Sequence, residues 1–479
     1  MRRAVDFVLI RNAELNGRRV SVRIADGKVA AIGQDLPDAG GPLFDAQGGA
    51  LLPGLHDHHL HLHALAARRN SVRCGPPDVS NADTLSRRLV ELDRHSAVWL
   101  RGVDYHESVA GDIDRDWLDD RLPRRPARIQ HRGGRLWVFN SAALAQLEPG
   151  PTDPLERKNG RLTGRLYDGD AWLRERMGAT RPSLADVSRE LAGYGITGVT
   201  DTTPQNGPGD LQAFASAQAN NELLQDLRVM GGDALHGADA SASQRVQPAA
   251  RKFHLLESAL PDFEACCRAV RRAHAANRNV AFHCVTRTEL VFVLGVLTET
   301  GSRLGDRIEH ASVTPPVLLP QFHELGLTVV TQPGLVHSRG DRYLTDVDAE
   351  DRGDLYRLRA FLDAGIRLAG SSDAPFGEPN PWVAMQAAVD RRTREGRELG
   401  GAEALTPDEA LALYTSPLSR PGTAAPGIRS GMPADLCVLD RGWARARASL
   451  ADVRVRLTLR AGECIHRTTR TSAPTERMA

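Results

Sequence analysis

The middle of the chain alternates short apolar runs with longer amphipathic stretches, a pattern typical of strands and helices that follow one another. Stretches such as "LPDFEACCRAVRRAHAANR" and "PPVLLPQFHELG" predict helices between the apolar runs. Eight strands with intervening helices fit a closed (β/α)₈ TIM barrel better than an open sheet, so we predict an α/β fold of this type over residues 53–425. The eight candidate strands are "ALLPGLHDHHLH", "ITGVTDTTP", "LRVMGGD", "RKFHLLE", "NVAFHCV", "RIEHAS", "LTVVTQP" and "IRLAGSSD".

Both ends of the chain show a different pattern, in which strands are separated by tight turns. The N-terminal part reads "DFVLIRNAEL" and "RRVSVRIADGKVAAIG", where Asp26-Gly27 is a hairpin signal. The C-terminal part contains "ADLCVLD" and "VRVRLTLRAGECIHR". We predict one small β-sandwich domain built from residues 1–52 and 426–470, followed by a disordered tail over 471–479.

The barrel pattern is interrupted early in the chain. From about residue 66 to residue 190 no regular alternation of strand and helix is visible, and Arg and Pro are frequent. We therefore predict an insertion of about 66–190 after the first barrel strand.

The charge of the chain is balanced, with 61 Lys plus Arg against 60 Asp plus Glu among 479 residues. This balance argues against broad attraction to nucleic acid or to an anionic membrane surface. No apolar run reaches the length of about 18 residues that a membrane helix needs. The start "MRRAVDFVLIRNAEL" lacks the long apolar region of a secretion signal, so we expect a cytoplasmic protein.

Lysine is rare in this chain, which has only Lys28, Lys158 and Lys252 among its 61 basic residues. Since arginine serves wherever a bare positive charge suffices, a lysine here is more often needed as an amine. Lys28 lies in a hairpin turn and Lys158 in a polar loop, so a solvated role explains both. Lys252 lies in an apolar strand and lacks so simple an explanation.

The stretch "PGLHDHHLHLH" places five histidines at the end of the first predicted barrel strand. Residues i and i+2 of a strand point to the same side, so spacing alone leaves three pairs as candidate metal ligands. These pairs are His56 with His58, His59 with His61, and His61 with His63.

Further residues of metal-ligand type lie within or at the end of later apolar strands. They are Lys252, His283, His310 and Asp373. Each has an ordinary alternative, because a strand histidine can be a core residue, a terminal Asp can cap a helix, and a lysine can form an ion pair. These alternatives would have to hold independently at five strand ends, so we predict one metal site at the C-terminal ends of the strands.

Two stretches resemble signatures of the amidohydrolase superfamily. "PGLHDHHLH" resembles its PG-[L/F]-x-D-x-H-x-H motif, and "GIRSGMPADLCVLD" resembles the return into its β-domain. Within the superfamily the chain is most similar to the amidohydrolase family 3 branch, which includes N-substituted formamide deformylases. The stretches "WLRGVDYHE", "RGGRLWVFNSAAL", "RIEHAS" and "SSDAPFG" carry that likeness.

The resemblance implies a set of ligands for one or two Zn²⁺ ions per chain, with other divalent metals as alternatives. Asp57 matches the aspartate of the motif, whereas His56, His58 and His63 fall outside the ligand positions. Lys252 matches a lysine that can be carboxylated to bridge two metals. The implied ligands are His59, His61, Lys252, His283, His310 and Asp373, and of these His310 and Asp373 are the implied catalytic residues.

The implied activity is zinc-dependent hydrolysis of a C–N bond in a small molecule, such as an amide, a formamide or an N-acyl group. A metal-activated hydroxide would attack, and Asp373 would move the proton. Alternatives are a hydrolytic deaminase, a cyclic-amide hydrolase, and a non-catalytic barrel used for binding or assembly, which we would expect to have lost metal ligands. We expect no nucleic-acid or membrane partner, and the sequence leaves open a homo-oligomer.

The chain departs from the branch where substrate contacts are expected. It has Gly133-Gly134-Arg135 where relatives often carry Asp-Gly-His, and "CVTRTEL" where many carry Gly-Asp-Arg. A different or more acidic substrate would explain both changes, although a surface or packing role explains the nearby residues equally well. The candidate substrate contacts are Arg132, Trp137, Asn140, Gln332, Arg339 and Arg342.

Overall fold

The structure is a computed structural model that describes residues 7–38, 40–76, 78–93, 99–177, 181–237 and 243–468. The predicted tail over 471–479 lies outside the described residues. The chain forms two compact units, one of Met1–Leu62 with Ser183–Ala479 and one of His63–Pro182.

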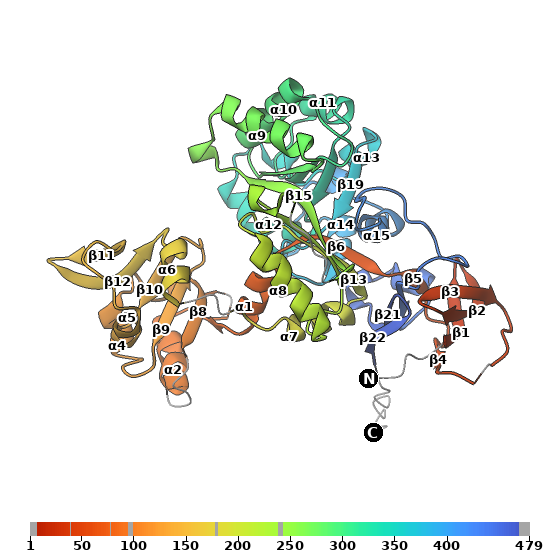
Figure 1. The fold of residues 1–479 in the computed structure, drawn as a ribbon, viewed down its shortest axis with the longest axis horizontal. Helices are drawn as coiled ribbons and strands as arrows, with labels where there is room; N and C mark the ends of the chain where they lie inside the picture. The colour runs from red at the N-terminus through yellow and green to blue at the C-terminus, as the bar shows by residue number, and fades with distance from the viewer. Residues whose placement is uncertain are drawn as a thin grey trace. The chain divides into compact units, whose positions relative to one another are not determined.

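An eight-stranded parallel barrel forms the centre of the first unit (Figure 1). All eight predicted strands are confirmed, in the sheet order β19-β18-β17-β16-β15-β14-β13-β6. The backbone N–H groups of Asp373 and His61 donate to the carbonyls of His59 and Ala374, both at 2.8 Å, and so join the last strand to the first. The strands are β6 (Leu55–Leu60), β13 (Ile196–Asp201), β14 (Asp226–Gly231), β15 (Val246–His254), β16 (Val280–Cys284), β17 (Arg307–His310), β18 (Thr328–Thr331) and β19 (Arg367–Gly370).

Several of these strands are buried on both faces, as parallel strands covered by helices must be. Every residue of β13, β17 and β18 is buried. Helices connect most of these strands, as the periodicity predicts, whereas the connection from β6 to β13 contains the second unit. The helices of this unit are α7 (Ala185–Gly193), α8 (Pro208–Ala219), α9 (Phe263–Ala275), α10 (Arg287–Thr300), α11 (Leu319–Glu324), α12 (Gly334–Asp346), α13 (Arg359–Asp363), α14 (Pro381–Asp390), α15 (Pro407–Thr415) and α16 (Trp443–Ala446).

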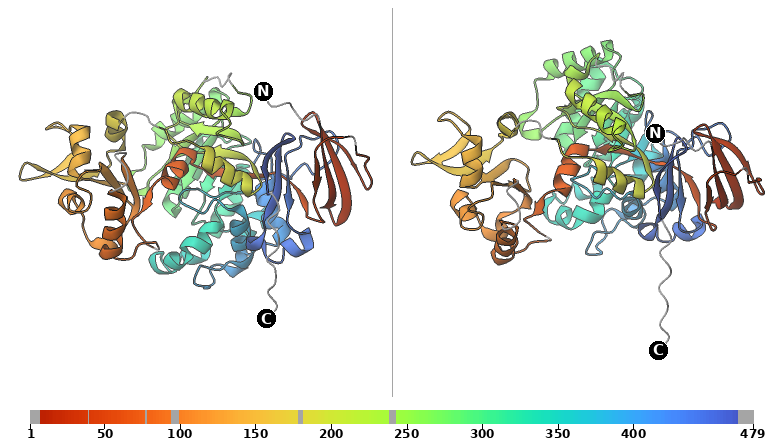
Figure 2. Two further views of the ribbon diagram at one scale, coloured as in Figure 1. Left: turned by 90° about the horizontal axis from the view of Figure 1, so that it is seen from below. Right: turned by 60° about the horizontal axis from the view of Figure 1, so that its bottom comes forward.

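The two chain ends form two four-stranded sheets that lie side by side in the views of Figure 2. One sheet has the order β3-β2-β1-β4 and the other β22-β21-β20-β5, so a strand of the N-terminal part joins the C-terminal strands. Both belong to the same compact unit as the barrel, and the domain boundaries at 52/53 and 425/426 stay predictions. The strands are β1 (Phe7–Leu15), β2 (Arg18–Ala25), β3 (Lys28–Gly33), β4 (Leu43–Asp45), β5 (Leu51–Pro53), β20 (Leu436–Leu439), β21 (Val455–Arg460) and β22 (Glu463–Arg467).

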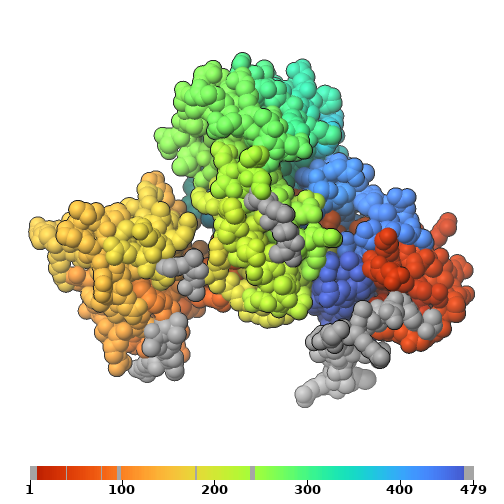
Figure 3. Space-filling model, in the orientation of Figure 1, coloured from red at the N-terminus to blue at the C-terminus, as the bar shows by residue number. Residues whose placement is uncertain are grey.

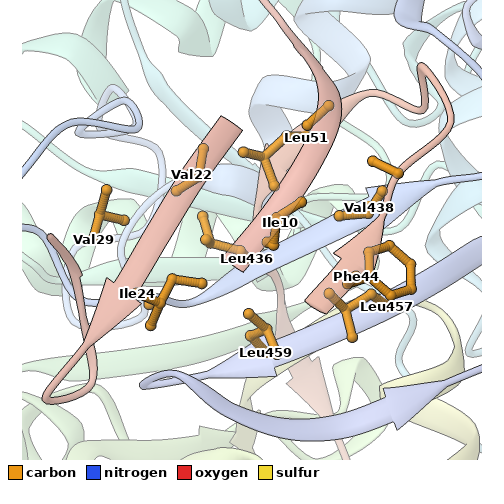
Figure 4. Close-up of a cluster of buried hydrophobic side chains, with 13 residues drawn as sticks. Ile10, Val22, Ile24, Val29, Phe44, Leu51, Leu436, Val438, Leu457 and Leu459 are labelled. Atoms are coloured by element: carbon orange, nitrogen blue, oxygen red, sulfur yellow. The ribbon is translucent and has the colours of Figure 1, made fainter. Parts of the chain in front are cut away.

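One apolar core connects these two sheets (Figure 4). Ile10, Val22 and Ile24 come from the N-terminal strands, and Leu436 and Leu459 come from the C-terminal strands. On the surface, the N-terminal strands lie directly against the C-terminal segments (Figure 3). The alternation of buried and exposed positions along β2 and β3 is what the sequence pattern predicts for strands with one covered face.

The second unit, His63–Pro182, contains a six-stranded mixed sheet in the order β11-β12-β10-β9-β8-β7. It overlaps the predicted insertion of 66–190, but α7 belongs to the barrel unit instead. The strands are β7 (Val72–Arg73), β8 (Leu100–Tyr105), β9 (Ala127–His131), β10 (Leu136–Phe139), β11 (Leu155–Lys158) and β12 (Arg161–Tyr167). The helices are α1 (Leu62–Arg69), which begins at the boundary, α2 (Ala82–Asp93), α3 (Glu107–Ala110), α4 (Arg115–Asp119), α5 (Ser141–Leu147) and α6 (Asp170–Met177).

Across the described ranges of both units, none of the helices combines the length and the apolar character that a bilayer crossing would require.

Candidate metal centre and active site

Two histidines of β6 and the loop after it meet an aspartate that follows β19. His59 Nε2 lies 3.3 Å and His61 Nε2 lies 3.4 Å from the same carboxylate oxygen, Oδ1 of Asp373. One ligand atom from each of the three side chains can be chosen so that all lie within 4.8 Å of one another. A divalent metal needs this spacing to bind all three, so these residues could hold one.

The neighbouring histidines of the same strand point elsewhere. His56 Nδ1 donates to the carbonyl of Ser416 at 2.6 Å, and His58 Nε2 is hydrogen-bonded to the Ser416 hydroxyl at 3.0 Å. Strand alternation puts these two rings on the side opposite to His59. Of the three pairs left open by spacing, the structure brings together His59 and His61 at Asp373.

The second ring nitrogens fix the orientation of the candidate ligands. His59 Nδ1 is hydrogen-bonded to Glu309 Oε2, and His61 Nδ1 is hydrogen-bonded to the Thr203 hydroxyl at 2.9 Å. An imidazole whose Nδ1 donates such a bond is left with Nε2 as the nitrogen that can bind a metal once Nε2 has lost its proton. Both histidines therefore present Nε2 toward Asp373.

His283 and His310 extend the cluster from the ends of β16 and β17. The ring centroid of His310 lies 4.8 Å from that of His59 and 4.4 Å from that of His283. His310 Nδ1 is hydrogen-bonded at 2.8 Å to Oε1 of Gln332, whose amide nitrogen donates to the Ser371 hydroxyl at 3.0 Å. Because Nδ1 of His310 makes this hydrogen bond, Nε2 is the ring nitrogen that remains available to bind a metal.

Burial favours the neutral form of the His283 and His310 rings, whereas desolvation of His59 is outweighed by Glu309 and Asp373, which raise the pKa of that ring. Desolvation, together with the nearby charge of His59, lowers the pKa of His310 to about 3, and desolvation and the charge of His310 lower the pKa of His283. Burial alone would raise the pKa of Asp373, but hydrogen bonds from His59 and His61 outweigh it and hold that pKa well below its usual range. Neutral imidazoles beside a carboxylate are the chemical form that a divalent metal binds.

Two candidate ligands have an unusual backbone conformation. His310 has φ +70° and Asp373 has φ +54°, both in the left-handed region that favours glycine. For other residues this conformation costs about 1–3 kcal/mol and persists only where the surroundings impose it. The Thr331 hydroxyl holds the His310 carbonyl at 2.9 Å, and the Phe376 N–H holds the Asp373 carbonyl at 2.8 Å. These two hydrogen bonds therefore stabilise the left-handed backbone conformation of His310 and Asp373.

Lys252, at the end of β15, lies buried beside this cluster. Its side chain is 5% exposed, and its Nζ has no hydrogen-bond partner within the described part of the chain. Desolvation lowers the pKa of the amine to about 8, although the charge of Glu309 acts in the opposite direction. A buried amine without a partner, near neutral imidazoles and a carboxylate, fits a lysine that is modified to become a metal ligand.

A buried ion pair that the sequence analysis did not identify supports the cluster. Both carboxylate oxygens of Glu309 accept hydrogen bonds from Arg307, and Oε2 also binds His59 Nδ1. Arg307 donates further to the carbonyl of His58 at 2.6 Å, which ties β17 to β6. The sequence contained a signal for this ion pair, because two opposite charges two residues apart in a buried strand lie on the same side and can pair.

Asp57 joins the first and last barrel strands. Its carboxylate accepts from the Ser372 hydroxyl at 2.5 Å and from the backbone N–H groups of Ser372 and His59, both at 3.1 Å. These bonds fix the segment before Asp373 against the end of β6. Asp57 therefore positions candidate ligands on both strands.

Two of the predicted substrate contacts have structural partners in the second unit. Asn140 is fully buried, caps α5 through the N–H of Ala143 at 2.9 Å, and donates to the Leu122 carbonyl at 2.6 Å. Trp137 is buried, and its indole N–H donates to Asp170 at 2.8 Å. These contacts engage the polar atoms of both residues, so we do not include them in the proposed site. Arg132 lies in the turn between β9 and β10, and its role stays a prediction.

The remaining predicted contacts belong to the barrel unit. Gln332 is fully buried and positions His310, as described above. Arg342 pairs with Asp346 at 3.3 Å in an exposed position. Arg339 donates at 2.6 Å to the carbonyl of Phe376, whose ring lies 5.8 Å from that of His61. Arg339 is therefore linked to the candidate ligand His61 through Phe376.

An eight-stranded parallel barrel with histidines, a lysine and an aspartate gathered at the C-terminal strand ends defines the class of metal-dependent barrel hydrolases. The model of the amidohydrolase family matches residues 43–466, and the chain belongs to that family. The predicted resemblance is thereby confirmed, and the protein is a hydrolase that acts on C–N bonds.

Individual relatives agree with this family. The chain is 27% identical to N-substituted formamide deformylase of Arthrobacter pascens, with 88% of this chain and 90% of the relative aligned. An uncharacterized metal-dependent hydrolase of Pyrococcus horikoshii OT3 has a similar fold, with a TM-score of 0.76, 20% identity, and 91% and 97% of the two chains covered. Guanine deaminase of C. acetobutylicum is similar at a TM-score of 0.54 and 12% identity, covering 96% and 100%. These two structures show the fold alone.

Proposed function

We propose that the protein is a zinc-dependent hydrolase that cleaves an amide, formamide or N-acyl bond of a small molecule. The observation that carries the proposal is the convergence of His59 Nε2 and His61 Nε2 on one oxygen of Asp373. We place the formamide class first, because the Arthrobacter pascens relative is named for deformylation of N-substituted formamides. The residues proposed to bind the metal are His59, His61, Lys252, His283, His310 and Asp373.

Zinc held by these side chains would supply the Lewis acidity that brings the pKa of water toward neutrality and polarises the substrate carbonyl. The residues of the chain supply the rest. Asp373 keeps a deprotonated carboxylate beside both imidazoles, so it can accept the proton from attacking water and return it to the departing nitrogen. Water adds across the C–N bond, and a carboxylic acid and an amine leave.

The proposal is tested by assaying the purified enzyme against matched sets of substrates. N-substituted formamides and N-acyl amines should be hydrolysed, while cyclic amides and aminated heterocycles should react at least about tenfold more slowly. Preferential release of ammonia from the heterocycles would replace the proposal with the deaminase alternative. If the protein contains zinc but hydrolyses none of these compounds, the result would favour the alternative of a non-catalytic barrel used for binding or assembly.

We propose that Lys252 reacts as a neutral amine with carbon dioxide and loses a proton to give a carbamate, whose carboxylate oxygens would help to hold the metal. Lys252→Arg should therefore lower the metal content, because a guanidinium cannot form this adduct, and should lower kcat/KM by at least about 100-fold. Metal analysis and steady-state kinetics measure both effects. Lys158→Arg, at an exposed position of the second unit, is the matched control and should change neither. Unchanged metal content and activity in Lys252→Arg would assign Lys252 a purely structural role.

A further inference from the structure

A cavity of about 300 Å³ lies at the opposite end of the barrel strands from the metal centre. Pro53 and Gly54 before β6, Asp226 to Arg228 at the start of β14, and Gln247 in β15 form one side. The segment from Thr415 to Leu436, between α15 and β20, provides much of the other side. The candidate ligands His59 and Lys252 lie further along β6 and β15, toward the C-terminal ends of these strands, and none of the candidate ligands lines the cavity, so the two sites are separate.

The walls of this cavity are partly apolar and partly charged. Leu227, Leu418, Ile428 and Met432 provide apolar surface. The charged side chains that line it are Asp226, Arg228, Arg245 and Asp435. Such a mixture suits a small molecule with an apolar body and one charged group.

Most of these charges already have partners. Arg245 Nε donates to Asp226 at 3.0 Å, and its Nη2 donates to the carbonyls of Leu224 and Gln225. Asp435 Oδ1 accepts from the backbone N–H of Ala461 at 2.6 Å. Asp226 is engaged by Arg245, and the guanidinium of Arg245 has little capacity left for a ligand.

Arg228 differs from Arg245 in the contacts of its guanidinium. Arg228 is half-buried, and its guanidinium makes no hydrogen bond and no ion pair with any residue that the structure describes, although the charge of Asp226 acts on it from a distance. A guanidinium that has lost part of its hydration gains strongly from a carboxylate, which accepts two parallel hydrogen bonds from its fork. The cavity therefore presents one available cation beside an apolar wall.

We infer that this cavity is a second ligand site, which binds a small organic carboxylate with Arg228 as the partner of the anion. The apolar wall would receive the body of the ligand. A phosphate fits less well, because Asp226 and Asp435 line the same cavity and a doubly charged anion would meet stronger repulsion from them. His56 also lines the cavity, so a bound ligand would lie against the strand that carries His59 and leads to His61.

Isothermal titration calorimetry of the full-length enzyme with benzoate tests the inference. Benzoate should bind with a dissociation constant on the order of 1 mM, and benzamide, its uncharged analogue, should bind at least about tenfold more weakly. Arg228→Met should weaken benzoate binding by at least about tenfold, and Arg228→Lys should weaken it less. Arg189→Met, at an exposed position of α7, is the matched control and should bind like the wild type.

Asp373→Asn separates this site from the metal centre and should leave benzoate binding unchanged, whether or not the proposed hydrolysis is correct. Benzoate should also raise the Tm of the wild type but not that of Arg228→Met, since a ligand stabilises the state that binds it. Equal binding to the wild type and to Arg228→Met would overturn the inference. So would the absence of binding to the wild type at about 10 mM, or its loss in Asp373→Asn.

Discussion

Replacing Asp373 with asparagine is expected to lower kcat/KM by about 10²–10⁴-fold, the range that removal of a general acid–base group usually costs. Asparagine has nearly the same shape and can keep hydrogen bonds to His59 and His61, which lie 3.3 and 3.4 Å from Asp373 Oδ1. It cannot accept the proton of water. The loss should therefore appear mainly in kcat, measured by steady-state kinetics on the best substrate from the screen.

Two controls separate chemistry from folding in this experiment. Asp346→Asn, at an exposed position near the end of α12, should keep wild-type activity. Circular dichroism and Tm should show that Asp373→Asn is folded, and metal analysis should show how much metal it retains. A folded Asp373→Asn enzyme that keeps more than about a tenth of the activity would exclude Asp373 as the proton carrier.

Replacing Glu309 with leucine is expected to lower the free energy of unfolding by about 3–5 kcal/mol, because it leaves Arg307 as a buried charge without its carboxylate. Both residues are almost fully buried, and Glu309 receives hydrogen bonds from Arg307 and from His59. The same change removes the acceptor that orients His59, so affinity for the proposed zinc ion should fall by about 10–100-fold. Chemical denaturation and competition with a chelator measure the two effects.

The double variant Arg307→Met with Glu309→Leu is the informative comparison. Removing both charges leaves no unpaired ion, so part of the lost stability should return, while zinc affinity stays low. Glu324→Leu, at an exposed position, is the control for loss of a carboxylate and should change stability little. A Glu309→Leu protein with wild-type stability would show that Arg307 is well solvated without its partner.

The barrel could be predicted from the sequence because its strands carry their own signal. Several of its parallel strands are covered on both faces, so they appear as apolar runs with a polar residue where the run ends. The second unit gave no such signal. Its sheet mixes parallel and antiparallel pairs, so no regular alternation of strand and helix extends along this part of the sequence.

The candidate site could be predicted only as a set of residue types at strand ends. Spacing could not choose among the histidines of β6, since the choice depends on Ser416, which is 360 residues away and binds His56. The support that Glu309 gives to His59 spans 250 residues and is equally invisible in a local pattern. Asn140 and Trp137 were chosen as substrate contacts because of their chemistry, and only their burial reveals that they have structural partners.

The closure of the barrel between β6 and β19 has a consequence for how the enzyme is made. Asp57 and Ser372, which are 315 residues apart, join the first barrel strand to the last, and the ligands His59, His61 and Asp373 lie at this same junction. During synthesis on the ribosome, His59 and His61 emerge early. Asp373 follows only after most of the chain has been made. If these three side chains hold the proposed metal, a chain that ends before residue 373 lacks one of the candidate ligands and cannot form the complete site.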